Sequence, residues 1–268
     1  MRLVRRPCLA SWCSFTRRQG TNLLLAHLRP VRGPHLRLAQ AAACPPCART
    51  ASVAACIDEL AAHPEVSGIL LQLPLPGELD SAALIDRIPV GKDVDGLTTA
   101  SAGLLARGEY GLWLCTLSGV IELLDAEGVS MKGAHAVVVG RSELVGRPMA
   151  QLLLQRDATV TIAHRYTSDL AAVTRPADIL VVAIGVPGLI GPEHVKPGAT
   201  VIDVGIHRTP TGLTGDVRTS EVDGIAGRIT PVPGGVGPMA IAMLMVNTLR
   251  AAQWAHHTAS PTPHPPPN

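Results

Sequence analysis

Aromatic residues are scarce in this chain of 268 residues, which contains three tryptophans, two tyrosines and one phenylalanine. Proteins that bind single-stranded nucleic acid stack the bases on aromatic side chains, so this composition argues against a nucleic-acid partner. Long apolar runs are lacking too, since none approaches the roughly 18 residues that a membrane-spanning helix requires. Hydrophobic residues nevertheless make up 47% of the chain. We therefore expect a globular core and no membrane partner.

Acidic residues and lysine are absent from the first 57 residues. Nine arginines occur there: Arg2, Arg5, Arg6, Arg17, Arg18, Arg29, Arg32, Arg37 and Arg49. The rest of the chain holds 14 basic and 21 acidic residues and is therefore acidic. An arginine-rich, acid-free N-terminus is typical of a mitochondrial transit peptide, but this one is poor in serine and has no clear amphipathic period. Three interpretations of residues 1–50 stay open: a shifted reading frame or wrong start, a targeting segment, or a diverged domain.

Five of the six cysteines lie in the same N-terminal segment. Cys44 and Cys47 form a lone CxxC pair without the second pair that a zinc ribbon would need, so we expect no metal site. The size and composition fit a reducing compartment better than a disulfide-bonded scaffold. We expect a cytoplasmic protein, with mitochondrial targeting by the arginine-rich segment as the alternative.

Helical and strand-like patterns alternate from about residue 51. Val53, Ile57 and Leu60 recur at helical spacing. Buried-strand patterns follow at residues 68–73, 134–140, 159–165, 178–185 and 199–205. The later ones are rich in Val and Ile without polar alternation, which is typical of parallel strands covered on both faces. We predict an α/β fold, with a Rossmann-type parallel sheet domain and a smaller α/β substrate domain.

The domain boundaries follow from these patterns. We expect a divergent segment, a substrate domain, a Rossmann-type domain, a helix that completes the substrate domain, and a proline-rich disordered tail. In that order they comprise residues 1–50, 51–115, 116–237, 238–255 and 256–268.

Two helices have faces that can be predicted. The helix beginning at Glu143 should turn one apolar face to the sheet. That face comprises Val145, Met149, Leu152 and Leu153. The helix after the last glycine-rich loop should pack on the first domain through Ile241, Leu244, Met245 and Leu249.

Two glycine-containing loops are candidates for ligand binding. Residues 140–146, GRSELVG, lie between a strand and a helix, where a dinucleotide-binding loop belongs, although the pattern is not GxGxxG. Gly140 permits a tight turn, Gly146 permits close helix packing, and Ser142 with the helix N-terminus offers hydrogen-bond donors to phosphate. Residues 230–239, TPVPGGVGPM, form a stiff loop that leads into a helix, with Pro238 suited to the first turn.

The end of the second predicted strand of the Rossmann-type domain favours one dinucleotide. An acidic residue there would bind the ribose 2′-hydroxyl of NAD, but this strand ends in His164 and Arg165. Arg165, with Arg141 close to it, would attract a 2′-phosphate. We therefore predict NADP over NAD, with a solvated Arg165 as the alternative.

Three strings together resemble the methylenetetrahydrofolate dehydrogenase/cyclohydrolase (FolD) family. They are GILLQLPLP at 68–76, GKDVDGL at 91–97 and the glycine-rich loop at 230–239, and GRSELVGRPM at 140–149 is similar to the family's cofactor loop. The resemblance covers residues 51–255. It implies oxidation of 5,10-methylenetetrahydrofolate with NADP and hydrolysis of the methenyl product to 10-formyltetrahydrofolate, without a metal, in a homodimer.

The resemblance also implies roles for single residues. It assigns Gly140, Arg141, Ser142 and Ile206 to the cofactor, and it places the loop with Gly235, Gly237 and Pro238 between nicotinamide and folate. Asp95 resembles the carboxylate that holds the pterin ring, since a carboxylate can accept two parallel hydrogen bonds. Its neighbour Asp93 is expected to be structural. Gln72 matches the glutamine beside the family's catalytic lysine.

The family's YxxxK motif, which supplies that lysine, is absent. Lys92 is the first lysine of the chain and Tyr110 the first tyrosine. Loss of the lysine should remove the hydrolytic activity, whereas hydride transfer depends chiefly on positioning two bound molecules. The function hypotheses are the bifunctional enzyme of one-carbon metabolism, a non-catalytic NADP-binding or dimer-partner protein, and a sequence error that hides an ordinary enzyme.

Overall fold

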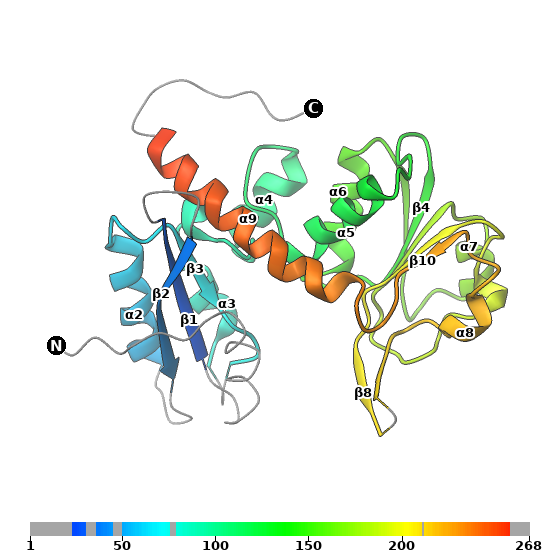
Figure 1. The fold of residues 1–268 in the computed structure, drawn as a ribbon, viewed down its shortest axis with the longest axis horizontal. Helices are drawn as coiled ribbons and strands as arrows, with labels where there is room; N and C mark the ends of the chain where they lie inside the picture. The colour runs from blue at the N-terminus through cyan, green and yellow to red at the C-terminus, as the bar shows by residue number, and fades with distance from the viewer. Residues whose placement is uncertain (1–22, 31–35, 45–49, 76–78, 211, 258–268) are drawn as a thin grey trace.

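The fold consists of two α/β parts joined by one long helix. The computed structural model describes residues 23–30, 36–44, 50–75, 79–210 and 212–257. In Figure 1 the first part lies at the left, the larger parallel-sheet part lies at the right, and helix α9 (Val236–His257) runs diagonally between them. No helix within these ranges is both long and apolar enough to cross a membrane.

The first part is built on an antiparallel three-stranded sheet of order β2-β1-β3. Its elements are β1 (Leu23–Pro30), β2 (Leu36–Cys44), α2 (Thr50–Ala62), β3 (Gly68–Leu71), α3 (Ser81–Ile85) and the 3₁₀ turn η1 (Val90–Lys92). Val53 and Ile57 of α2 pack with Ile69 and Leu71 of β3, as the helical and strand-like patterns predict. Strands β1 and β2 come from the arginine-rich segment whose interpretation the sequence leaves open.

The second part is a parallel five-stranded sheet of order β10-β7-β6-β4-β5. The strands are β4 (His135–Val139), β5 (Thr159–Ala163), β6 (Ile179–Val182), β7 (Thr200–Asp203) and β10 (Arg228–Ile229). The predicted Rossmann-type sheet is confirmed. Alternate residues of each strand point to opposite faces of the sheet, and helices cover both faces. Val138 packs with α5 (Cys115–Ala126) and α6 (Gly146–Gln155), and Val137 packs with residues around α7 (Leu170–Thr174) and α8 (Thr219–Val222).

Helix α6 begins at Gly146 and not at Glu143 as predicted. Residues 141–145 are held instead in a turn, where the backbone leaves the sheet edge. The predicted face is otherwise confirmed: Met149, Leu152 and Leu153 are buried in the core, and Val145 packs against it.

Helix α9 packs on the first part, and the prediction of its packing face is only partly right. Leu244 packs with Leu70 and Val94, whereas Ile241 and Leu249 are exposed. The buried positions of α9 are Val236, Met243, Asn247, Thr248, Ala251 and Ala252. The face rotates because α9 crosses α5 closely at Gly119, where a Cβ atom would lie 2.7 Å from Cβ of Met239. Asn247 also fixes the rotation, since its Nδ2 donates to the carbonyl oxygens of Val94 and Trp113 at 3.0 and 2.8 Å. The predicted disordered tail lies outside the described residues from 258 onward.

The remaining elements lie around these two parts. Helix α4 (Thr99–Arg107) contacts α6, and the 3₁₀ turn η2 (Pro192–His194) contacts α7. The hairpin of β8 (His207–Thr209) and β9 (Gly212–Thr214) projects from the edge of the parallel sheet. This edge carries the carboxyl ends of the strands, where open α/β sheets bind their ligands.

Candidate active site

Two glycines shape the loop that follows β4. Gly140 has φ +134°, and a Cβ atom there would lie 2.3 Å from the carbonyl oxygen of Ala183. A Cβ atom on Gly146 would lie 2.1 Å from the carbonyl oxygen of Gly140. Both glycines are therefore required by close backbone approach, as the sequence predicts. The result is a tight turn that leads directly into the N-terminus of α6.

Ser142 caps this turn. Its hydroxyl oxygen accepts hydrogen bonds from the backbone N–H groups of Val145 and Gly146 at 3.2 and 3.4 Å. These two bonds leave the hydroxyl hydrogen available as a donor. Together with the end of α6, the loop can therefore offer donors to an anionic group.

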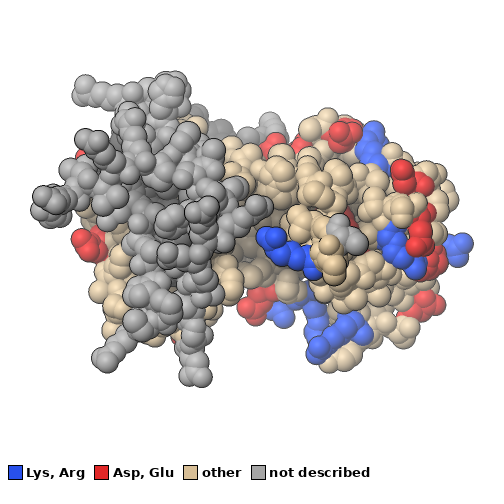
Figure 2. All heavy atoms as spheres, turned by 60° about the horizontal axis from the view of Figure 1, so that its bottom comes forward, with Lys and Arg blue, Asp and Glu red and all other residues tan. Residues whose placement is uncertain are grey.

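Two arginines gather on the ring of Tyr166 next to this loop. The guanidinium carbon of Arg165 lies 4.6 Å from the ring centroid, and that of Arg141 lies 5.7 Å from it. Arg165 also donates a hydrogen bond to the Tyr166 hydroxyl at 2.7 Å. Both arginines that the sequence singles out thus lie against one ring, and the tyrosine between them is an addition to the sequence-based site. In Figure 2 basic and acidic side chains are interspersed over the right-hand half of the molecule.

Exposed apolar side chains follow the ends of four neighbouring strands. Leu144 follows β4, Tyr166 follows β5, Val186 follows β6 and Ile206 follows β7, and all four are exposed. Ile206 is 58% exposed. A row of exposed apolar groups beside polar loops is typical of a binding surface. The carboxyl edge of the sheet therefore has the composition of a dinucleotide site, with cations at one end and apolar contacts along it.

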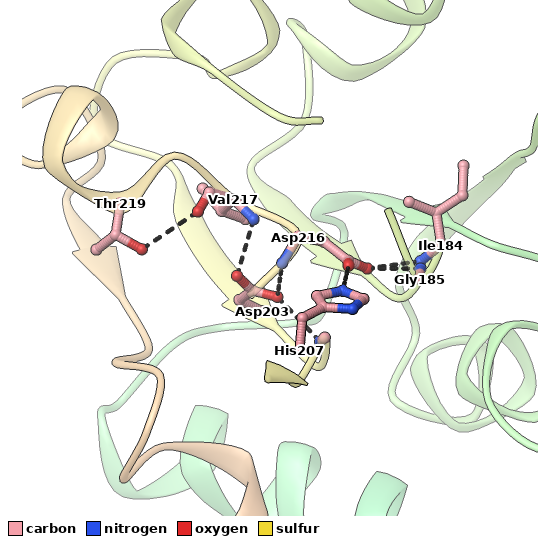
Figure 3. A network of polar contacts seen from close by, with 8 residues as sticks. Ile184, Gly185, Asp203, His207, Asp216, Val217 and Thr219 are labelled. Carbon is pink, nitrogen blue, oxygen red and sulfur yellow. Dashed lines mark hydrogen bonds and ion pairs between the residues drawn. The ribbon is translucent and has the colours of Figure 1, made fainter. Parts of the chain in front are cut away.

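A buried polar network holds this edge together (Figure 3). Asp203 accepts hydrogen bonds from the N–H groups of Gly205, Asp216 and Val217, at 2.9–3.0 Å. Asp216 accepts from the N–H groups of Ile184 and Gly185 and lies 2.6 Å from Nε2 of His207. Sequence reasoning missed Asp216 and His207. The sequence feature that could have pointed to Asp216 is its position just after a short hairpin that contains glycines. The sequence alone does not show which groups this aspartate contacts.

The glycine-rich loop before α9 adjoins Ile206. The N–H group of Gly235 donates to the carbonyl oxygen of Pro231 at 2.9 Å, and a Cβ atom on Gly235 would lie 2.6 Å from that oxygen. A Cβ atom on Gly237 would lie 3.8 Å from Cδ1 of Ile206. Pro238 is the third residue of α9, as expected for the first turn. The structure thus brings the loop and Ile206 together.

Asp93 and Asp95 have different environments. Asp93 is buried and accepts hydrogen bonds from the N–H groups of Leu97 and Thr98 and from the Ser101 hydroxyl, at 2.7–3.1 Å. These bonds close the turn before α4, so the expected structural role of Asp93 is confirmed.

Asp95 is partly buried and contacts Cys115. Desolvation, reinforced by the nearby Asp93 carboxylate, raises the pKa of Asp95 to about 6. Burial, with the Asp95 carboxylate beside it, also raises the pKa of the Cys115 thiol. Nδ2 of Asn247 in α9 donates to the carbonyl oxygen of the adjacent Val94 at 3.0 Å. Among the described residues the Cys115 thiol donates to Asp95, whose carboxylate keeps acceptor capacity for further hydrogen bonds, which suits a ligand-binding group.

Within the described residues, the first part has no lysine beside Gln72 that could act as the family's catalytic lysine. Nζ of Lys92 donates to the carbonyl oxygens of Ala61 and His63 at 2.7 and 2.9 Å, at the end of α2. Gln72 is exposed and its Nε2 donates to the carbonyl oxygen of Leu73 at 3.0 Å. Lys92 therefore has a structural role, and Gln72 lies next to the proline turn without a lysine partner.

A hollow of about 460 Å³ joins the two parts. Its lining comprises Leu73, Pro74, Leu75, Leu79, Ser81 and Leu144. Leu144 belongs to the loop after β4, so the proline turn of the first part faces the glycine loop of the second. Within the ranges that the structure describes, no cluster of His, Cys, Asp or Glu could hold a metal ion.

The sheet order, the glycine-lined turn after β4 and the ligand-accessible carboxyl edge define a Rossmann-type dinucleotide-binding protein. Two family models match the chain. The tetrahydrofolate dehydrogenase/cyclohydrolase NAD(P)-binding domain matches residues 114–256, and the tetrahydrofolate dehydrogenase/cyclohydrolase catalytic domain matches residues 39–95. The chain belongs to the tetrahydrofolate dehydrogenase/cyclohydrolase family, which confirms the resemblance seen in its motifs.

Individual relatives agree with this assignment. "Bifunctional protein FolD 2" of Frankia casuarinae is 66% identical over 209 residues, which are 78% of this chain and 73% of the relative. "Bifunctional protein FolD" of Synechococcus sp. (strain RCC307) is 52% identical over 216 residues, 80% of this chain and 73% of that protein. Among solved structures, the FolD dehydrogenase/cyclohydrolase of Campylobacter jejuni superposes with a TM-score of 0.76 at 43% identity, covering 78% of this chain and 74% of the other.

A further solved relative contains ligands. The methylenetetrahydrofolate dehydrogenase-cyclohydrolase of Trypanosoma brucei, complexed with NADP cofactor and inhibitor, superposes with a TM-score of 0.74 at 38% identity. The match covers 79% of this chain and 75% of that protein. A fold and a sequence shared over this length support a common reaction class.

Proposed function

We propose that this protein oxidises 5,10-methylenetetrahydrofolate to the 5,10-methenyl compound with NADP and hydrolyses the product to 10-formyltetrahydrofolate, as the bifunctional relatives are named to do. The observation that carries this proposal is the match of both domains to one family, with the glycine loop after β4 and the loop before α9 intact. The non-catalytic alternative has no observation in its favour.

We assign the cofactor to the carboxyl edge of the parallel sheet. Gly140 and Ser142 would hold the diphosphate at the N-terminus of α6, and Arg141 with Arg165 would bind the 2′-phosphate. Ile206 would form an apolar wall for the nicotinamide. The cations gathered on Tyr166 support NADP, because the hydroxyl group of NAD would leave them without an anionic partner.

We assign the folate to the first part and the loop before α9. Asp95 would accept hydrogen bonds from the amino-pyrimidine edge of the pterin, because few protein donors compete for its oxygens. Gly235, Gly237 and Pro238 would lie between the pterin and the nicotinamide, where small residues permit close approach. Hydride would then pass directly from the bridging carbon of the folate to the nicotinamide ring.

The hydrolytic step depends on a different set of groups. Water attacks the bridging carbon of the methenyl compound, and a base of tuned pKa usually assists such a step. Lys92 is engaged at the end of α2, and Gln72 carries no ionisable group. We therefore propose that hydrolysis is slow compared with hydride transfer, which requires chiefly positioning of the two molecules.

We further propose that the protein is a cytoplasmic homodimer, with residues 51–115 and 238–255 as the folate domain and residues 116–237 as the NADP domain. Strand β5 is an edge strand whose Ile162 is 42% exposed, which would suit an interface between two copies. Mitochondrial targeting by the arginine-rich segment stays the alternative localisation.

A product-resolved assay tests the function. The purified chain is mixed with 5,10-methylenetetrahydrofolate and NADP, and NADPH, methenyltetrahydrofolate and 10-formyltetrahydrofolate are quantified over time. We expect NADPH with accumulation of the methenyl compound before the formyl compound appears. The Asp95→Ala variant tests the pterin site in the same assay. NADPH formation equal to that of the wild type would contradict the assignment of that site.

A further inference from the structure

The Asp216 carboxylate joins two loops at the edge of the parallel sheet (Figure 3). It is fully buried, and its Oδ2 accepts the N–H groups of Ile184 and Gly185 at 2.9 and 2.8 Å, just after β6. Its Oδ1 lies 2.6 Å from Nε2 of His207, just after β7. We assign the hydrogen to Nε2, because a carboxylate that already accepts two N–H bonds acts as an acceptor for the third.

His207 also closes the base of the β8–β9 hairpin. It is the first residue of β8, and Asp216 lies two residues after the end of β9. Asp203 forms a second clamp at the same base, because its Oδ1 accepts the N–H groups of both Gly205 and Asp216. The backbone is therefore fixed on both sides of Ile206, at Gly205 and at His207.

The turn that carries Ile206 has little room to rearrange. A Cβ atom on Gly205 would lie 2.5 Å from Cγ of Asp216, so the turn lies directly on the carboxylate. The Ile206 side chain itself is 58% exposed, so packing restrains it only in part. Its direction is thus set by its backbone, and the backbone is set by the buried polar network.

We propose that His207 is a positioning residue for the nicotinamide end of the cofactor, which it aligns by holding Asp216 and the turn with Ile206 in one arrangement. This inference deepens the proposed function and rests on it. His207 does not touch the reacting atoms. It acts by reducing the freedom of the apolar wall before the cofactor binds, so less ordering is needed on binding.

The adenosine end of the cofactor provides an internal control. Arg141 and Arg165 lie after β4 and β5, on the other side of the sheet edge from His207. A fragment that lacks the nicotinamide, adenosine 2′,5′-bisphosphate, should depend on the arginines alone. Loss of a positioning group for the nicotinamide should weaken NADP and leave this fragment unaffected.

The test compares His207→Leu, His207→Gln and His207→Asn with the wild-type chain, by calorimetric titration with NADP and with the bisphosphate and by the dehydrogenase assay. Gln carries an amide donor on a longer side chain and should retain most of the function. Leu has no donor, and the amide of Asn is too short to replace Nε2. For these two variants we expect NADP affinity and kcat to fall about tenfold, with the affinity for the bisphosphate within about twofold of wild type.

Three outcomes would overturn the inference. The first is an unchanged NADP affinity and kcat in His207→Leu and His207→Asn. The second is an equal loss for NADP and the bisphosphate, which would mean general loosening of the domain. The third is a His207→Gln variant as impaired as His207→Leu. If wild type binds the bisphosphate and NADP but forms no NADPH from the folate, the proposed function fails while the binding comparison still tests His207.

Discussion

Replacing Asp95 by asparagine should stabilise the protein at neutral pH while it abolishes folate binding. Desolvation and the Asp93 carboxylate raise the pKa of Asp95 from 3.8 to about 6, so the native state binds this proton more tightly than the unfolded chain does. Stability therefore falls as the pH rises from about 4 to about 6 and stays lower above that range. The rise of the Asp95 pKa from 3.8 to about 6 corresponds to at most about 3 kcal/mol of stability.

Asparagine has the same shape and no charge, so it avoids this cost at every pH. In urea unfolding we expect Asp95→Asn to exceed wild type by up to about 3 kcal/mol at pH 7.5 and to equal it near pH 4. The two proteins differ only at residue 95, so the pH dependence of the difference between their stability curves reports on Asp95 and the groups coupled to it. A stabilising substitution that removes function is the expected signature of a ligand-binding carboxylate.

Asp93→Asn is the matched control two residues away. The Asp93 carboxylate accepts three hydrogen bonds from the turn before α4, so this variant should lose about 1–3 kcal/mol at neutral pH. The reasoning would be refuted if Asp95→Asn were less stable than wild type at pH 7.5, or if the difference between the two did not change between pH 4 and 7.5. Either result would mean that protein contacts stabilise the ionised Asp95.

Three further predictions concern the cofactor loop and the hydrolytic step. Arg165→Ala should lower kcat/KM with NADP about thirtyfold and leave kcat/KM with NAD nearly unchanged. Tyr166→Leu should act in the same direction more weakly. Equal losses with both dinucleotides would contradict the 2′-phosphate assignment. Gly146→Ala should abolish dinucleotide binding by calorimetry because its Cβ atom meets backbone, whereas Gly103→Ala, in open space on α4, should bind normally. Lys92→Met should lower the unfolding free energy by about 1 kcal/mol because the lysine loses its two hydrogen bonds. The rate of methenyl hydrolysis should not change. Slower hydrolysis by the folded variant would make Lys92 part of that chemistry.

The parallel sheet and its glycine loop could be predicted because local sequence determines them. Runs such as HAVVV specify strands buried on both faces, and Gly140 and Gly146 are required by backbone approach at their own positions. The proximity of Arg141 and Arg165 also follows locally, since both lie directly after neighbouring parallel strands. The different roles expected of Asp93 and Asp95 came from the family resemblance and not from the local sequence.

What could not be predicted depends on contacts between distant segments. The rotation of α9 follows from Gly119 and from the hydrogen bonds of Asn247, which lie far from each other in sequence. The pairing of His207 with Asp216 requires the β8–β9 hairpin to close, and hydrophobic periodicity carries no information about that contact. The strands β1 and β2 lie in a segment whose arginine-rich composition resembles no regular element.

Isotope transfer tests the central claim most directly. The wild-type chain is incubated with NADP and 5,10-methylenetetrahydrofolate deuterated at the bridging carbon, and the NADPH formed is analysed by mass spectrometry. Direct hydride transfer between the two assigned sites predicts deuterium at the nicotinamide ring of the NADPH. Absence of NADPH, or NADPH without deuterium, would contradict the account.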